Sequence, residues 1–410
     1  MMKKIMKSIA LMSALFLMSC SKGINEKDLA GFNYVIGTQT VGAKYKFTNE
    51  TNLVETAKAI RGMGSNLLKF SLSPRYYWEN YDIPFDENIK CLKDLAQEKS
   101  VKQVLDMDFK YYQIWSYEFS QYTQEPEGMK KDEYQIKFTN GLSDEYAAKS
   151  YQEIYDLASY LLKTYSGTDK VFFLGNWEGD WHLRWDYNRK KPANPKTIEG
   201  MIKWINTRQE AIDDAKRDTP HNNVQLYHYL ELNLSDLAVS GEACVTNSVL
   251  PYTNTDYVSF SSYSATNPPS TEEEMDSVLT RHLNYIESKI PVKKTIKGKR
   301  LFIGEYGWSE AAYPQEIINE RAKWVMKTAL KWGCPFILFW EMYNNELTED
   351  GSNRGFWLID KHNKKTPLYY THQNFYKESR MWIKEYYKKN KKMPSYDEFV
   401  EAAVDFDSLN

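Results

Sequence analysis

Cysteine and histidine are scarce in this chain of 410 residues, which contains four Cys and six His. Apart from Cys20, the cysteines are Cys91, Cys244 and Cys334, an odd number with no close pair, so the sequence shows neither a zinc motif nor a disulfide framework. The histidines form no H-x-H or H-E-x-x-H spacing, which disfavours a metal-dependent amide or ester hydrolase. We therefore expect no metal and no cofactor.

The chain also lacks an excess of charge of either sign, since its formal net charge is -2. It therefore lacks the excess of positive charge that is typical of nucleic-acid-binding proteins. Internal repeats and low-complexity segments are absent. The segment Gly37–Gly42 does not have the spacing of a glycine-rich nucleotide loop, which argues against an open, doubly wound sheet as the alternative fold.

The N-terminal residues resemble a targeting signal. Three lysines, Lys3, Lys4 and Lys7, precede a short apolar run, which is too brief for the about 20 residues of a membrane span. The run ends in Leu-Met-Ser-Cys20, which resembles the lipobox of bacterial lipoproteins. The resemblance implies a signal peptide over residues 1–19, lipidation of Cys20 and anchoring in the cell envelope at the outer membrane, on its periplasmic or surface face. The alternative is an ordinary secretory signal with a chance cysteine.

Short apolar segments alternate with longer amphipathic ones, which predicts parallel strands joined by helices. The expected strands are Asn33–Gly37, Asn66–Ser71, Val101–Asp108, Lys170–Leu174, Asn223–Tyr229, Tyr257–Ser261, Arg300–Gly304 and Pro335–Trp340. The expected helices are Asn52–Met63, Asp86–Lys99, Asp144–Tyr165, Pro195–Arg217, Thr271–Ile290, Gln315–Trp332 and Pro367–Lys389, with an insertion over Phe109–Leu142.

This alternation predicts the α/β class and a single (β/α)8, or TIM, barrel. We expect a linker over residues 20–30, the barrel over residues 31–390 and a short C-terminal appendage over residues 391–410.

Active sites of such barrels lie at the C-terminal ends of the strands. Glu178 follows the fourth expected strand, and Glu305 ends the seventh. Glycoside hydrolysis needs such a carboxyl pair, one member to protonate the leaving oxygen and the other to attack the anomeric carbon or activate water. The 12 Trp and 31 Tyr fit a carbohydrate protein, because aromatic rings can stack on sugar faces.

The strand ends Ile-Gly-Glu305-Tyr-Gly and Leu-Phe-Trp340 resemble those of clan A glycoside hydrolases, in particular cellulase- and mannanase-like members. The resemblance implies that Glu305 is the nucleophile and Glu178 the acid/base. It further implies that Trp340 is a stacking platform, that Tyr263 bonds to the nucleophile and that Asn176 binds the sugar 2-hydroxyl.

One departure from that pattern matters, because Trp177 separates Asn176 from Glu178 where the family has Asn directly before the acid. Either the backbone bulges here or Asn176 has another role, and Asp180 is an alternative acid. Weaker substrate-binding candidates are Lys69, which could also orient the nucleophile, His228 with Glu231 nearby, Trp181, Trp185, Trp308, and Asp106 and Asp108 at the end of the third expected strand.

The sequence therefore predicts a retaining glycoside hydrolase that cleaves a poly- or oligosaccharide through a covalent intermediate. The alternative is a catalytically degenerate barrel that binds glycans at the cell surface. We expect a carbohydrate substrate, no nucleic acid, membrane contact only through the lipid anchor, and a monomer.

Overall fold

The computed structural model describes residues 24–74, 76–121, 141–184 and 187–410. Its eight strands pair in parallel in the order β1-β8-β7-β6-β5-β4-β3-β2. They are β1 Ile36–Thr38, β2 Leu67–Leu72, β3 Tyr111–Ser116, β4 Val171–Gly175, β5 Gln225–Leu232, β6 Tyr257–Ser261, β7 Leu301–Tyr306 and β8 Ile337–Phe339.

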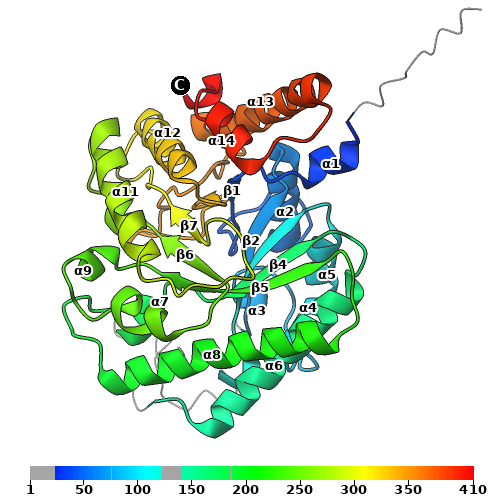
Figure 1. The fold of residues 1–410 in the computed structure, drawn as a ribbon, viewed down its shortest axis with the longest axis vertical. Coiled ribbons are helices and arrows are strands. Elements are labelled where there is room, and N and C mark those ends of the chain that lie inside the picture. The colour runs from blue at the N-terminus through cyan, green and yellow to red at the C-terminus, as the bar shows by residue number, and fades with distance from the viewer. Residues whose placement is uncertain (1–23, 75, 122–140, 185–186) are drawn as a thin grey trace, which may run out of the picture.

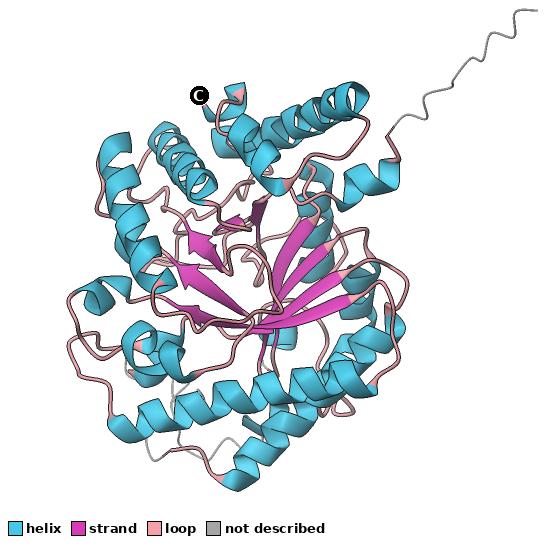
Figure 2. Ribbon diagram, in the orientation of Figure 1, coloured by secondary structure: helices cyan, strands magenta, loops and turns pink. Residues whose placement is uncertain are grey.

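The sheet closes on itself between its first two strands. A parallel bridge joins Gln39 to Lys69, and the N–H of Thr40 donates to the carbonyl of Lys69 at 3.0 Å. Figure 2 shows the strands at the centre with helices around them. The predicted single-domain (β/α)8 barrel is thereby confirmed.

Five of the larger helices begin where a polar side chain caps free N–H groups. Thr51, Ser143, Asn194, Thr271 and Thr366 each accept a hydrogen bond from the first turn of the helix that follows. The larger helices are α2 Asn52–Met63, α6 Asp144–Thr164, α8 Pro195–Asp218, α11 Glu272–Glu287, α12 Gln315–Trp332 and α13 Pro367–Asn390. The shorter ones are α1 Glu26–Gly31, α3 Tyr76–Glu79, α4 Leu92–Gln97, α5 Lys99–Asp106, α7 Gly179–Leu183, α9 Ser235–Val239, α10 Tyr263–Thr266 and α14 Tyr396–Ala403.

The third predicted strand, Val101–Asp108, is wrong, because this segment forms α5. The Glu98 carboxylate accepts the N–H groups of Ser100 and Val101 and so caps a helix, whose buried side chains recur at helical spacing. The strand is β3, inside the predicted insertion. Asp106 and Asp108 therefore precede β3 and lie at the end of the barrel opposite the expected active site.

Strand β5 is longer than predicted and continues from Tyr229 to Leu232. His228 consequently lies inside the strand rather than at its end, and Glu231 becomes part of the strand. The His228 ring is fully buried, and burial lowers its pKa well below the usual value.

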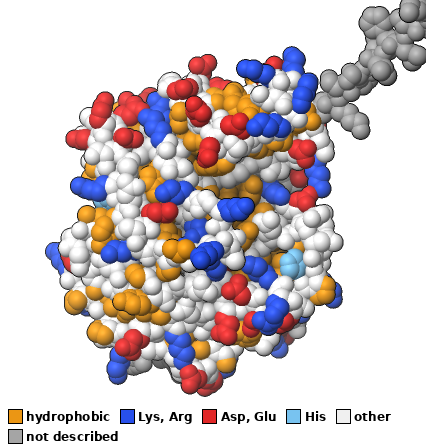
Figure 3. Space-filling view, in the orientation of Figure 1, with side chains coloured by type: hydrophobic (Ala, Val, Ile, Leu, Met, Phe, Trp, Pro, Cys, Tyr) orange, Lys and Arg blue, Asp and Glu red, His pale blue; other side chains and the backbone are white. Residues whose placement is uncertain are grey.

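The C-terminal appendage forms α14, which packs with α12 and α13 at one edge of the molecule (Figure 1). The hydroxyl of Tyr396 donates to the carbonyl of Cys334 at 2.5 Å, and Phe399 packs on Phe375. Helix α1 reaches the same edge, where Lys384 of α13 pairs with Glu26 at 3.0 Å. No helix in the described ranges is both long and apolar enough to cross a bilayer. Acidic and basic side chains intermingle over the face in Figure 3.

Candidate active site

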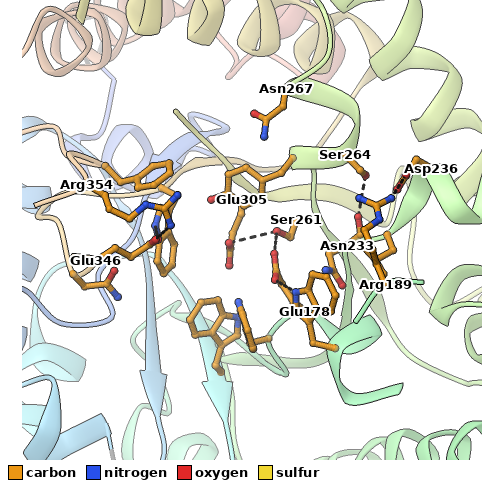
Figure 4. A pocket seen from close by; sticks show the side chains of 18 of the residues that line it. Glu178, Arg189, Asn233, Asp236, Ser261, Ser264, Asn267, Glu305, Glu346 and Arg354 are labelled. Atoms are coloured by element: carbon orange, nitrogen blue, oxygen red, sulfur yellow. Dashed lines mark hydrogen bonds and ion pairs between the residues drawn. The ribbon is translucent and has the colours of Figure 1, made fainter. Parts of the chain in front are cut away.

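A cavity of about 730 Å³ opens at the C-terminal ends of the strands. Aromatic side chains make up much of its wall: Tyr76, Trp115, Trp177, Trp181, Tyr263, Trp340 and Phe356. Glu178 and Glu305 both line it, and Figure 4 shows them near its middle. Two ion pairs, Glu346–Arg354 and Asp236–Arg189, lie on opposite sides of this pair of carboxylates.

The hydroxyl of Ser261, at the end of β6, bridges the two glutamates. Its oxygen lies 2.5 Å from Oε1 of Glu178 and 3.4 Å from Oε2 of Glu305. The Ser261 hydroxyl has one proton and can donate to only one of the two carboxyl groups at a time. When Glu178 is protonated, Glu178 donates to Ser261 and Ser261 donates to Glu305. The structure thus places the two predicted carboxylates in one hydrogen-bonded unit.

Glu178 precedes α7 with a φ of 22°, a backbone conformation that side-chain-bearing residues rarely adopt. Its Oε2 accepts the indole N–H of Trp181 at 2.6 Å. Burial raises the pKa of Glu178 to about 7, and the negative charge of Glu231 adds to the rise, while the bonds from Ser261 and Trp181 oppose it. A carboxyl with this pKa can carry a proton near neutral pH and release it.

Glu305 is the residue before the last in β7, and its exposed fraction is only 2%. Burial raises the pKa of Glu305 well above its usual value. The ammonium group of Lys69 opposes this rise, and the negative charges of Glu231 and Glu178 add to it. Nζ of Lys69 lies 3.4 Å from Oε1 of Glu305 and 3.0 Å from the carbonyl oxygen of Gly304. Among the described residues, the hydrogen bonds to this carboxylate come from Lys69 and Ser261 rather than from Tyr263, which lines the cavity beside it.

Glu231 is a third carboxylate of this group and lies behind the other two, with no exposed surface. Its Oε2 lies 2.7 Å from Nζ of Lys69 and 2.7 Å from the hydroxyl of Ser259, and its Oε1 accepts the N–H of Glu178 at 3.1 Å. A Cβ at position 304 would come within 1.9 Å of the Ser259 hydroxyl and 2.9 Å of Glu231, so Gly304 leaves the space for this contact.

Asn176 does not line the cavity, because its side-chain amide binds the backbone of Glu231. Its Nδ2 donates to the Glu231 carbonyl at 3.1 Å, and its Oδ1 accepts the Glu231 N–H at 3.2 Å. The extra residue, Trp177, turns instead to the cavity wall.

Asp180, the alternative acid, is fully buried and serves the backbone. Its carboxylate accepts the N–H groups of Asn233, Leu234 and Val245 at 2.8 to 3.1 Å. The geometry therefore leaves Glu178, and not Asp180, facing Glu305.

Trp340 follows β8 and packs against Trp115 with ring centroids 6.1 Å apart. Its indole N–H donates to Glu346 at 3.0 Å, and the other oxygen of Glu346 pairs with Arg354 at 2.5 Å. Glu346 thereby fixes both a flat ring and a cation at one side of the cavity.

Two further predicted substrate contacts, Trp308 and His228, also do not line the cavity. Trp308 is buried, packs on Tyr306 and carries the Arg321 guanidinium over its ring at 5.8 Å. The His228 side chain is fully buried and does not line the cavity. Trp185, Cys20 and the predicted signal peptide lie outside the described residues.

No protein-family model matches this sequence. No curated protein matches it either. Among solved structures, the chain is similar to a family 39 glycoside hydrolase from the gut symbiont Bacteroides cellulosilyticus, with a TM-score of 0.51 and 12% identity over 84% of this chain and 64% of that one, less than two thirds of its length.

Two further solved structures share the fold. A GH5_18 protein from Bifidobacterium longum subsp. infantis matches with a TM-score of 0.51 and 11% identity over 80% of this chain and 73% of that one. A GH5_18 variant from Streptomyces cattleya, in complex with Manβ1-4GlcNAc, matches with a TM-score of 0.50 and 10% identity over 84% of this chain and 77% of that one. At these identities the similarity is one of fold.

Proposed function

We propose that this chain is a retaining glycoside hydrolase in which Glu305 is the nucleophile and Glu178 the acid/base. The observation that carries the proposal is the pair of buried carboxylates bridged by Ser261 inside a cavity walled by aromatic rings. Rings of this kind stack on sugar faces, and paired carboxyls are what glycoside cleavage requires.

In the first step, Oε of Glu305 attacks the anomeric carbon while the Glu178 proton passes to the glycosidic oxygen. The bond between the anomeric carbon and the leaving oxygen breaks, and an ester between the sugar and Glu305 forms. Burial raises the pKa of Glu178 to about 7, which keeps this proton available near neutral pH. Lys69 stabilises the negative charge that Glu305 needs for the attack.

In the second step, Glu178 is a carboxylate and accepts a proton from a water molecule. That water attacks the anomeric carbon, the ester bond breaks, and Glu305 leaves as a carboxylate. Both groups return to their starting protonation states, so the cycle balances as one hydrolysis.

The spacing of the carboxyl groups supports retention of configuration. The two distances from the Ser261 hydroxyl place the two glutamate oxygens that contact it at most about 6 Å apart, which is compatible with the roughly 5 to 5.5 Å between the carboxyl groups of retaining enzymes. The same pair, together with an open cavity, favours an enzyme over a degenerate glycan-binding barrel, which has no need of either carboxylate.

A panel of β-linked poly- and oligosaccharides, including Manβ1-4GlcNAc, tests the proposal. We expect wild-type protein to release reducing sugar from at least one member, and Glu305→Gln to lose nearly all turnover while still binding that glycan. Unchanged turnover by Glu305→Gln would contradict the assignment. Binding without turnover by the wild type, on every member, would favour the glycan-binding alternative.

We also propose that Cys20 carries a lipid and anchors a monomeric enzyme in the cell envelope. The support is the Leu-Met-Ser-Cys sequence after a basic and then apolar segment. Metabolic labelling with a fatty acid should mark the wild-type chain and not Cys20→Ala. Equal labelling of both chains would exclude this anchor.

A further inference from the structure

Four charged side chains from different strands converge beneath the cavity. Lys69 comes from β2, Glu231 from β5 and Glu305 from β7, while Glu178 follows β4. Lys69 and Glu231 have no exposed surface, so neither can contact a solvent-borne sugar directly. Any effect of Lys69 and Glu231 on a sugar must therefore act through the residues that they contact, Glu178 and Glu305.

We propose that Glu231 is a positioning residue that holds both catalytic carboxylates in their working geometry. It reaches Glu178 through its bond to the Glu178 N–H and reaches Glu305 through Lys69. That Glu178 and Glu305 are catalytic rests on the proposed function. The contacts of Glu231 with Glu178 and Lys69 do not depend on it.

The link to Glu178 is backbone-directed. Oε1 of Glu231 accepts the N–H of Glu178 at 3.1 Å, at the point where φ is 22°. A backbone in this sparsely populated region persists only where surrounding contacts hold it. The same conformation orients the Glu178 side chain between Ser261 and the indole N–H of Trp181.

The link to Glu305 passes through a single cation. Lys69 lies 2.7 Å from Oε2 of Glu231 and 3.4 Å from Oε1 of Glu305, so Glu231 fixes the ammonium group and the ammonium group faces the nucleophile. Ser259 holds the same oxygen of Glu231 from β6 at 2.7 Å.

Asn176 completes the arrangement from the other side. Its amide clamps both the N–H and the carbonyl of Glu231, which fixes the strand at the height of the cavity floor. This role accounts for the departure from the Asn-Glu pattern. The asparagine supports Glu231, and Glu231 in turn supports Glu178, two residues beyond Asn176.

The charge of Glu231 also acts on the titration of the pair. Its negative charge raises the pKa of both Glu178 and Glu305, although burial is the larger cause for each. Other titratable groups that face this cluster are Tyr76, Tyr229, Tyr263 and Glu341. Removing the charge at position 231 should therefore lower the pKa of Glu178.

Nuclear magnetic resonance on the intact chain tests the proposal without any substrate. The Trp181 indole N–H reports the position of Glu178, and carbon-13 at the glutamate carboxyls reports titration, assigned with Glu178→Gln and Glu305→Gln. In Glu231→Gln we expect the indole resonance to move and the Glu178 midpoint to fall by about one pH unit.

The matched control is Glu118→Gln, which breaks another fully buried ion pair, Glu118–Arg208, away from the cavity. It should leave the Trp181 resonance and the Glu178 midpoint unchanged. If Glu231→Gln does not fold, Ser259→Ala removes one donor to Glu231 and should still move the indole resonance. An unmoved indole resonance in whichever of the two variants folds would overturn the proposal.

Kinetics on the active glycan then separate this proposal from the proposed function. For Glu231→Gln we expect kcat to fall by at least about tenfold with KM within about twofold, because the carboxylates and not the sugar contacts are displaced. Turnover that survives Glu305→Gln would reject the proposed nucleophile and leave the resonance result standing. A kcat unchanged in Glu231→Gln would reject the positioning role.

Discussion

The hydroxyl oxygen of Ser261 lies 2.5 Å from Oε1 of Glu178, and this contact favours the charged form of the carboxyl. In Ser261→Ala the pKa of Glu178 should therefore rise, and the alkaline limb of the kcat/KM profile should move up by about one pH unit, the equivalent of about 1.4 kcal/mol. Ser264→Ala is the control, since Ser264 lines the cavity but bonds to Asn233 and Ser235. A limb that stays in place or moves down would show that Ser261 does not set this titration.

Trp181 offers a second route to the same carboxyl, through its indole N–H at 2.6 Å from Glu178. Trp181→Phe keeps a ring in the cavity wall but removes the donor. We expect the alkaline limb to rise again, with KM within about twofold of wild type because the apolar surface remains. A pH–rate profile of the variant against wild type measures both quantities, and a large change in KM with an unmoved limb would assign Trp181 to sugar binding instead.

Trp340 should act on binding more than on proton transfer, since its ring lines the cavity and its N–H is directed to Glu346. Trp340→Ala should raise KM by up to about tenfold, in line with about 0.5 to 1.5 kcal/mol for aromatic contacts. Trp340→Phe keeps most of the apolar surface, and its KM should lie between those of the wild type and Trp340→Ala. Saturation curves on the active glycan decide this, and an unchanged KM in Trp340→Ala would remove the residue from the binding surface.

The acid role is tested by comparing Glu178 with Asp180. Azide should restore turnover of an activated glycoside in Glu178→Ala, because this anion attacks the anomeric carbon of the glycosylated enzyme without the help of a base, forming a glycosyl azide and releasing Glu305 as a carboxylate. Asp180→Ala should instead lose stability by more than about 3 kcal/mol, since three backbone N–H groups lose their acceptor. Rescue of Asp180→Ala, with none for Glu178→Ala, would move the acid role to Asp180.

The raised pKa of Glu178 also makes a prediction about stability. Its folded value of about 7 lies above the ordinary value of 4.5, so the stability that the protonated form provides is fully present below about pH 4.5 and is lost as pH rises to about 7. Glu178→Gln should thus be more stable than wild type at pH 8 by about 3 kcal/mol and little changed at pH 4.

Urea denaturation at both pH values measures this difference. Glu346→Gln, which removes a cavity carboxylate that is about one third exposed, is the control and should change stability by less than about 1 kcal/mol at either pH. A Glu178→Gln variant that is less stable than wild type at pH 8 would argue against a buried, proton-retaining Glu178.

Alternation of apolar segments was sufficient to predict the barrel. The strand Tyr257–Ser261 and the helices at Asn52–Met63 and Gln315–Trp332 have the predicted bounds. The segment at Val101 was misread because valine and leucine between polar residues suit a strand, whereas the cap from Glu98 selects the helix.

The site was less predictable than the fold. Glu178 and Glu305 were evident from their places after β4 and in β7, and the structure brings them together. Ser261 was missed because a serine at a strand end carries no chemical signature on its own. Glu231 was underestimated because the strand was expected to end at Tyr229; the continuing alternation through Leu230 and Leu232 was the signal that it went further.

The central claim is that Glu305 forms a covalent bond to the sugar while Glu178 handles the proton. The most direct measurement is to trap the intermediate with a slow, 2-fluoro-substituted activated glycoside of the active sugar, digest the protein and locate the added mass. We predict one sugar per chain, attached to Glu305, and no attachment in Glu305→Gln. A label on Glu178 or Glu231, or continued hydrolysis with inversion of the anomeric configuration and no label, would contradict the account.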